Sequence, residues 1–239
     1  MSDIFDPMKN PIISIITPTF ESMKYIDYTA KSILNLDISY EWITIDNCST
    51  DGTREFLLKL SEQYKNIRVV LNERNSGGPF ESYSKGVTLA KGKYIIFIDH
   101  DDTISSNKSL VLAVEKLEEN ESIYSVISKV SYMDESGKVY KTKKIPFVKY
   151  NSIITGELLG WLIFISPTYP LKQGAICYRK ALFEKTGLHP IPAPTEHRMK
   201  RAQGISPGFF FPDARAIHNA ELVFHEFLGT IWAKLRGQI

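Results

Sequence analysis

Short apolar runs that end in polar residues recur along the first hundred residues of this chain. The runs cover residues 12–17, 41–46, 67–71 and 94–99. Between them, apolar side chains return at helical spacing, as in Ile26, Ala30, Ile33 and Leu34. The pattern predicts four strands that alternate with three helices. Connections of this length require parallel crossovers, so the sequence predicts an α/β layered fold.

The fourth run leads directly into a group of carboxylates. Residues 94–98 are typical of a strand buried on both faces of a sheet, and Asp99, Asp101 and Asp102 follow at once. Ligands of open α/β sheets bind outside the carboxyl ends of such strands. Neighbouring carboxylates repel one another, and their hard oxygens suit Mg²⁺ or Mn²⁺. The alternative is a solvated acidic turn in which Asp102 or Thr103 caps the next helix.

The carboxyl ends of parallel strands share one edge of a sheet, so other polar residues are expected beside the acidic group. These residues are Thr19, Asp46, Asn47 and Arg74. Asn47 has the alternative role of capping the helix that follows it. A Gly-x-Gly-x-x-Gly fingerprint and a Gly-Lys-Thr/Ser phosphate loop are both absent, which argues against dehydrogenases and kinases.

The second half of the chain has a different pattern. The spacing predicts a helix over residues 109–117, a hairpin from 125–133 and 138–142, a strand over 174–178 and a short helix over 181–185. Residues 153–165 are apolar without a clear period. A last amphipathic helix is expected over 222–235, where such a stripe is more often a core or dimer contact than a membrane contact.

Composition excludes several classes of protein. The chain has 239 residues, 43% of them hydrophobic, and a net charge of +2, which suits one large core and gives no field for nucleic acid. Two cysteines provide no disulfide framework, which fits a reducing compartment. The polar N-terminus lacks the features of a signal peptide, and no apolar run reaches the ~18 residues of a membrane span. A cytoplasmic protein is expected.

Four segments together resemble glycosyltransferase family 2, whose members are inverting enzymes with the GT-A fold. The segments are Pro18-Thr19-Phe20, residues 45–53, Asn75-Ser76-Gly77 and residues 90–102. A weaker match covers residues 174–187. The resemblance implies one Rossmann-like nucleotide-binding sheet with a C-terminal acceptor-side region. Residues 1–103 would form the nucleotide-sugar half of one continuous domain, and residues 104–239 the acceptor half and a helical tail.

The resemblance also implies a chemistry. The donor would be a nucleotide-sugar, most simply a UDP-sugar, and the acceptor a saccharide or lipid-linked saccharide in bacterial surface polysaccharide synthesis. Asp101 and Asp102 would hold Mn²⁺ or Mg²⁺ with support from Asp99, and the position of Asn47 contacts the pyrimidine in this family. The expected donor-binding residues are Pro18, Thr19, Phe20, Asp46, Asn47, Arg74, Gly77 and Asp99.

A general base should lie on the acceptor side, beyond the strand at 174–178. Glu196 is the first candidate, with His197 as its orienting partner or as the base itself, and Asp213 is the second. The sequence departs from the family pattern at Glu21, Asn47 and His197, where the family usually has Asn, Asp and Asp.

The sequence allows two alternative functions and two alternative contacts of the C-terminal helix. One rival is a sugar nucleotidyltransferase, although residues 18–22 lack the glycine-rich, lysine-containing segment that this class needs. The other rival is a degenerate, non-catalytic nucleotide-sugar-binding protein. The C-terminal helix provides either a dimer contact or a peripheral contact with the inner face of the membrane.

Overall fold

The computed structural model describes residues 10–134, 138–143, 152–154 and 173–186. The chain divides into two units, Met1–Ile191 and Pro192–Ile239, and all described residues belong to the first. The candidate bases Glu196 and Asp213 and the C-terminal amphipathic helix therefore lie outside the described residues, as does nearly all of the apolar stretch 153–165.

Strands and helices alternate at the start of the chain as the hydrophobic pattern predicts. The elements are β1 (Ile13–Thr19), α1 (Ile26–Leu34), β2 (Tyr40–Asp46), α2 (Thr53–Gln63), β3 (Ile67–Leu71), α3 (Phe80–Leu89) and β4 (Tyr94–Phe97). After them come α4 (Asn107–Glu119), β5 (Ser125–Ile127), β6 (Val130–Met133), β7 (Val139–Lys143), the 3-10 turn η1 (Gln173–Ala175), β8 (Ile176–Arg179) and α6 (Ala181–Thr186).

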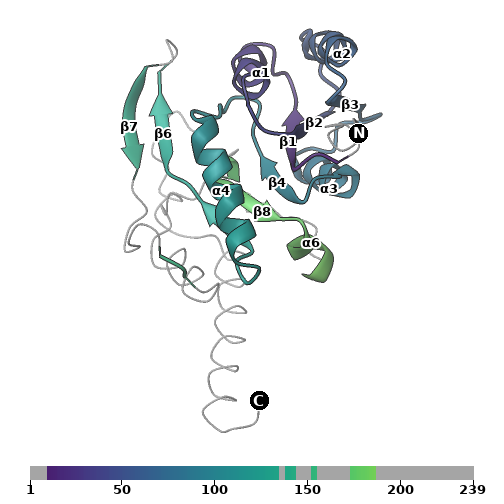
Figure 1. Ribbon diagram of the computed structural model, residues 1–239. Coiled ribbons are helices and arrows are strands. Elements are labelled where there is room, and N and C mark those ends of the chain that lie inside the picture. Colours follow the sequence, from purple (N-terminus) through teal and green to yellow (C-terminus); the bar gives the residue numbers. More distant parts are fainter. Residues whose placement is uncertain (1–9, 135–137, 144–151, 155–172, 187–239) are drawn as a thin grey trace, which may run out of the picture. The chain divides into compact units, whose positions relative to one another are not determined.

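A six-stranded sheet in the order β3-β2-β1-β4-β8-β5 forms the centre of the fold (Figure 1). Strands β1 to β4 run parallel, and β8 runs antiparallel to both β4 and β5. The chain moves outward from β1 to β3 and then returns to place β4 on the other side of β1. The sheet therefore has a topological switch point between β1 and β4, where ligands of open α/β sheets bind.

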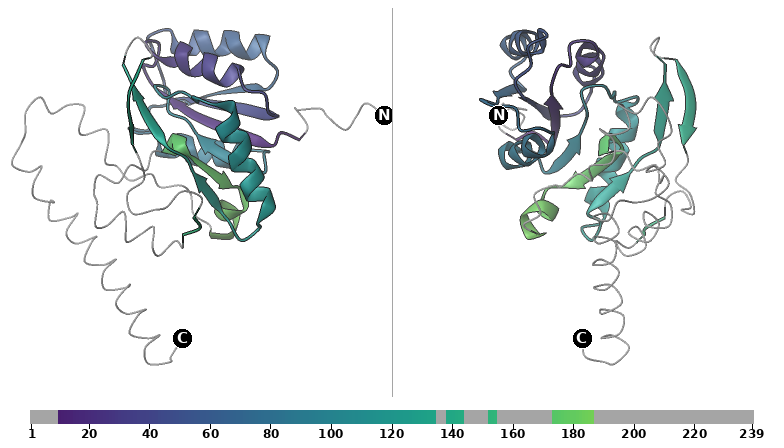
Figure 2. Two further views of the ribbon diagram at one scale, coloured as in Figure 1. Left: turned by 60° about the vertical axis from the view of Figure 1, so that its left-hand side comes forward. Right: turned by 180° about the vertical axis from the view of Figure 1, so that it is seen from behind.

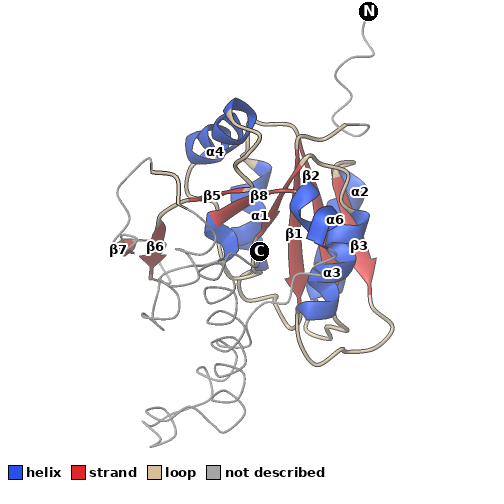
Figure 3. Cartoon of the chain, turned by 90° about the horizontal axis from the view of Figure 1, so that it is seen from below, coloured by secondary structure: helices blue, strands red, loops and turns tan. Residues whose placement is uncertain are grey.

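Helices cover the sheet on both faces (Figures 2 and 3). Successive strand residues point to opposite faces, so Ile15 packs toward α1, α2 and α4, and its neighbour Ile16 packs toward α3. Helix α1 contributes Ile26, Ala30 and Ile33 to the first face. This α/β arrangement confirms the predicted fold class.

The predicted hairpin is correct only in its second part. Residues 125–127 are not part of the hairpin: they form β5, which pairs with β8 in the main sheet. Strands β6 and β7 pair with each other and form a separate two-stranded sheet. The strand expected from Gly174 starts at Ile176, because Gly174 and Ala175 belong to η1.

The capping role considered for Asp102 or Thr103 is also wrong. Ser106 caps α4, and its Oγ accepts a hydrogen bond from the Ser109 N–H at 3.3 Å. Within the part of the chain that the structure describes, no helix has the length and apolar character needed to cross a membrane.

Candidate functional site

The acidic loop, residues 99–102, follows β4 at the switch point of the sheet. The Asp102 N–H donates to the Asp99 carbonyl oxygen at 3.1 Å and closes a turn. Thr29, fully buried on α1, places its Oγ1 at 2.8 Å from the carbonyl oxygens of both His100 and Asp102. The backbone of the loop is therefore fixed from the α1 face of the sheet.

Tyr83 contacts the same loop from the opposite face of the sheet, and sequence reasoning missed it. Its hydroxyl donates to Asp99 Oδ1, and its ring is buried on α3. Burial raises the pKa of Tyr83 far above its usual range, and the charges of Asp99, Asp102 and Asp101 raise it further. Tyr83 is therefore a neutral donor beside three carboxylates. Helical spacing marks it as a core residue but does not reveal its partner.

The ends of β1 and β2 are joined through Asp46, which is fully buried. Asp46 Oδ1 accepts from Thr19 Oγ1 at 3.3 Å and from Ser49 Oγ at 2.5 Å. Its other oxygen, Oδ2, accepts from the Ser49 N–H at 3.1 Å and lies 3.2 Å from Arg54 Nε. Arg54 is the second residue that the sequence did not indicate. Asp46 fixes the strand ends, and its direct contact with a ligand stays a prediction.

The loops after β1 and β2 are bonded to each other at several points. The Glu21 N–H donates to Ser49 Oγ at 3.0 Å, and Glu21 Oε1 accepts from the Thr50 N–H at 2.7 Å. The Met23 N–H donates to Asp51 Oδ2 at 2.9 Å. Glu21 thus has a structural reason to replace the usual Asn, because its longer side chain reaches Thr50.

Asn47 lies in a network of amides at the ends of β2 and β3. Its Oδ1 accepts from the Ser76 N–H at 3.1 Å, and its Nδ2 donates to Asn75 Oδ1 at 3.0 Å. Asn72 Nδ2 also donates to Asn47 Oδ1, at 3.2 Å. Backbone N–H groups can only donate, so the bond from Ser76 fixes the orientation of the Asn47 amide.

The remaining donor-binding candidates lie at the same edge of the sheet. Thr19 and Pro18 are buried in β1, and the ring of Phe20, just after the strand, is 47% exposed. Arg74 and Gly77 are exposed in the loop after β3, where Gly77 has a positive φ of 80°. The structure thus brings the predicted residues to the carboxyl edge, and the Phe20 ring offers a flat apolar surface there.

The acidic loop fits a divalent cation that is shared with a ligand. Among the described residues, no three or more His, Cys, Asp or Glu side chains form a ready-made metal cage. Mg²⁺ usually takes one or two carboxylates and completes its shell with phosphate and water oxygens. Gly174 lies beside the same loop, since a Cβ at this position would lie 3.6 Å from Asp102 Oδ2, an ordinary contact.

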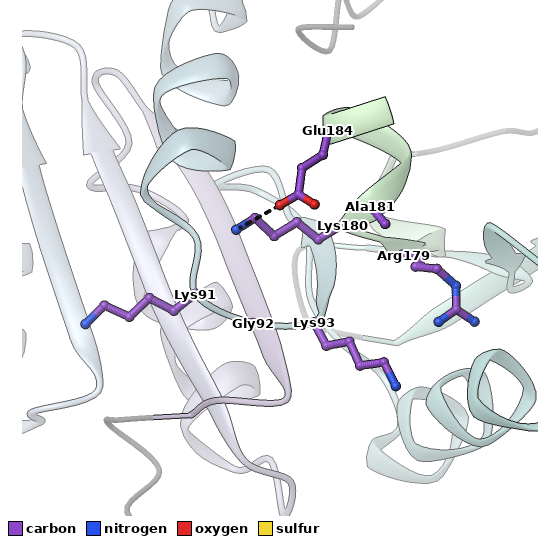
Figure 4. A pocket seen from close by; sticks show the side chains of 7 residues that line it. All are labelled: Lys91, Gly92, Lys93, Arg179, Lys180, Ala181 and Glu184. Carbon is purple, nitrogen blue, oxygen red and sulfur yellow. Dashed lines mark ion pairs between the residues drawn. The ribbon is translucent and has the colours of Figure 1, made fainter. Parts of the chain in front are cut away.

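A basic pocket of about 270 Å³ lies at the opposite edge of the sheet (Figure 4). Its lining residues are Lys91, Gly92, Lys93, Arg179, Lys180, Ala181 and Glu184. Lys180 pairs with Glu184 at 3.5 Å, Lys93 pairs with Glu118, and Arg179 Nε donates to the Ile123 carbonyl oxygen. These cations bond to separate partners, and the side chains of Lys91, Lys93 and Arg179 point apart (Figure 4). They do not converge on one ligand position.

An open, mostly parallel sheet with carboxylates and amides at its switch point is typical of nucleotide-binding α/β proteins, and this fold matches solved glycosyltransferases of the GT-A type. The model of "Glycosyl transferase family 2" matches residues 14–183, and the chain therefore belongs to this family.

Curated relatives match part of the chain. The putative teichuronic acid biosynthesis glycosyltransferase TuaG of Bacillus subtilis is 37% identical over 99 residues, which is 41% of this chain and 39% of TuaG. The poly(ribitol-phosphate) beta-glucosyltransferase of Bacillus spizizenii is 36% identical over 101 residues, or 41% of this chain and 16% of that protein. The chain thus matches less than half the length of these relatives.

Solved structures agree with the fold. Residues 1–349 of TarS from Staphylococcus aureus, in complex with UDP-GlcNAc, superpose with a TM-score of 0.58 and 25% identity over 73% of this chain and 47% of that chain. A mannosyltransferase from Pyrobaculum calidifontis, in complex with GDP-Man and Mn²⁺, has a TM-score of 0.51 at 18% identity over 77% of this chain and 49% of its own. The second likeness concerns the fold alone.

Proposed function

We propose that this chain is an inverting, metal-dependent glycosyltransferase that moves a sugar from a UDP-sugar to a saccharide or lipid-linked saccharide acceptor. The observation that carries the proposal is the acidic loop, which lies at the switch point and is held by Thr29 on one face and Tyr83 on the other. Membership of the family and the likeness to TarS with UDP-GlcNAc support the reaction and the donor. The names of the relatives support a role in bacterial surface polysaccharide synthesis.

The reaction assigns separate tasks to the two parts of the chain. Residues 1–103 bind the donor, and residues 104–239 bind the acceptor. The acceptor oxygen attacks the anomeric carbon, the bond from this carbon to the phosphate oxygen breaks, and the hydroxyl proton passes to a base. Glu196 remains the first candidate for this base and Asp213 the second.

Asp101 and Asp102 would hold the divalent cation. When bound, Mn²⁺ or Mg²⁺ stabilises the negative charge on the departing diphosphate. Both carboxylates belong to a loop whose backbone is fixed by Thr29, so the main chain that carries them is in place before the donor binds.

The amide network supports a particular contact with the nucleobase. Asn47 Oδ1 already accepts hydrogen bonds from Ser76 and Asn72, whereas its Nδ2 has one N–H left after donating to Asn75. A contact with the base would therefore use this N–H and require a carbonyl oxygen on the base. Uracil offers such an oxygen, so uridine is the first candidate for the nucleoside of the donor, and thymidine and guanosine follow it.

Asn47→Ala is expected to weaken the binding of uridine diphosphate about tenfold, because it removes a donor and loosens the loop around Ser76. Isothermal titration calorimetry measures the affinity. Asn66→Ala is the control, since Asn66 Nδ2 donates to the carbonyl oxygen of Tyr40 at 3.5 Å, at the start of β2 and away from the carboxyl edge. Unchanged affinity for uridine, thymidine and guanosine diphosphates would mean that Asn47 does not contact the base.

A panel of nucleotide-sugars tests the proposed function as a whole. Transfer or hydrolysis is expected with a UDP-sugar and Mn²⁺, and loss of turnover is expected with a chelator. Uridine diphosphate at about 100 times its Kd should stabilise the fold by about 2.7 kcal/mol in a thermal-shift assay.

Other outcomes of this panel separate the rival functions. Nucleotide binding without sugar transfer or hydrolysis would identify a non-catalytic binding protein. Release of pyrophosphate from UTP and a sugar 1-phosphate would identify a nucleotidyltransferase. An equal thermal shift with Mn²⁺ and with chelator would refute the metal dependence.

A further inference from the structure

We propose that Tyr83 is a positioning residue of the donor site, which acts by holding Asp99 in a single orientation for the ligand. The inference rests on the proposed function, because it assumes that the acidic loop binds a diphosphate and a divalent cation. Tyr83 lies within the residues that the family model matches but outside the four short motifs that resemble the family in sequence, and it sits 16 positions before Asp99.

The contact is specific on the Tyr83 side. The ring is 2% exposed and packs edge-on against Phe97, with ring centroids 5.1 Å apart and an interplanar angle of 83°. Phe97 in turn contacts Tyr178 at 5.8 Å and Phe183 at 6.0 Å. This aromatic cluster fixes the ring, so the hydroxyl has one direction in which to donate.

The contact is also specific on the Asp99 side. Asp99 Oδ1 accepts the bond from the Tyr83 hydroxyl. Asp99 is only partly buried, whereas Tyr83 is buried, so the carboxylate lies between the core and the carboxyl edge of the sheet. A bond that engages one oxygen leaves Oδ2 available to accept from or coordinate a ligand. A neutral phenol fixes Asp99 in this way without adding a positive charge that would compete with a cation.

The loop itself does not depend on Tyr83. Thr29 Oγ1 binds the carbonyl oxygens of His100 and Asp102, and the Ile98 N–H donates to the Ile16 carbonyl oxygen at 3.0 Å. Removal of the Tyr83 hydroxyl should therefore leave the backbone in place and release only the Asp99 side chain. An intact loop with a released Asp99 side chain would show that Tyr83 positions Asp99 and is not needed to hold the loop itself.

The test compares Tyr83→Phe with Tyr178→Phe. Both changes remove one hydroxyl from a ring of the same aromatic cluster, but only the first removes a bond to a carboxylate of the loop. Calorimetry would measure the affinity for uridine diphosphate with Mn²⁺ and with chelator. The gain in affinity from Mn²⁺ is expected to fall about tenfold in Tyr83→Phe and to stay at the wild-type value in Tyr178→Phe. The affinity with chelator should change little in either variant.

A double-mutant cycle with Asp99→Ala makes the test more specific. If Tyr83 acts through Asp99, Tyr83→Phe should have no further effect once Asp99 is replaced by Ala. An equal loss in both backgrounds would overturn the inference. A wild-type Mn²⁺ gain in Tyr83→Phe would overturn it too.

Two further outcomes complete the design. Should Tyr83→Phe fail to fold, Asp99→Ala alone tests the pair, and a wild-type gain from Mn²⁺ in that variant would overturn the inference. If the wild-type protein itself gains no affinity from Mn²⁺, the metal dependence in the proposed function has failed, and with it the basis for a role of Tyr83.

Discussion

Asp102→Asn is expected to lower kcat/KM for transfer from a UDP-sugar by about 10²–10³-fold. The amide keeps the shape of the carboxylate but removes its negative charge, so a divalent cation loses a ligand at the moment when charge develops on the diphosphate. The main-chain bonds of Asp102 do not involve its carboxylate: its N–H donates to the Asp99 carbonyl oxygen, and its own carbonyl oxygen accepts from Thr29.

Steady-state kinetics over a series of Mn²⁺ concentrations measures this effect. High Mn²⁺ should restore part of the activity if Asp102 is a metal ligand. Glu115→Gln on the exposed side of α4 is the control, since it removes a carboxylate of the chain far from the β4 end. Full activity of Asp102→Asn at low Mn²⁺ would contradict the assignment.

Gly92→Ala is expected to destabilise the fold by about 3 kcal/mol. A Cβ at residue 92 would lie 2.6 Å from the Ser14 backbone N, 2.7 Å from the Ile13 carbonyl C and 2.8 Å from Ser14 Oγ. The nearest two of these atoms are backbone atoms of β1, which cannot move without disturbing the centre of the sheet.

The same substitution would also disturb a buried carboxylate. Glu41 Oε1 accepts from Ser14 Oγ at 2.6 Å, from the Lys91 N–H at 2.5 Å and from the Gly92 N–H at 3.3 Å. Displacement of residue 92 weakens these bonds and leaves Glu41 buried with fewer donors, which adds to the steric cost.

Urea unfolding followed by circular dichroism measures the loss of stability in Gly92→Ala. Gly78→Ala is the matched control, because a Cβ there meets only the Phe80 ring at 3.5 Å, an ordinary contact. Equal unfolding midpoints for the two variants would mean that the backbone of β1 shifts to accommodate the added methyl group at little cost in stability.

Much of the fold follows from the sequence by simple rules. Apolar runs separated by helical spacing specify β1 to β4, and their parallel connections place every carboxyl end on one edge. That is why the sequence alone assigns Asp46, Asn47 and Asp99 to Asp102 to one region. The rule concerns the direction of the chain alone, and it needs no knowledge of side-chain contacts.

The partners of these residues did not follow from the sequence. Tyr83 and Arg54 have the helical spacing of ordinary core or surface positions, and nothing local marks them as partners of Asp99 and Asp46. Similarly, the alternation in residues 125–133 predicts strands but not which strand pairs with which, so the pairing of β5 with β8 was missed.

The sequence by itself thus determined the order of the elements, the edge that carries the polar residues and the family. The tertiary structure decided which side chains hold the acidic loop, which neighbours surround Asn47 and where Gly92 packs. The physical reason is that periodicity reports the face on which a residue lies, whereas a hydrogen bond or a close contact depends on the register between segments that are far apart in the chain.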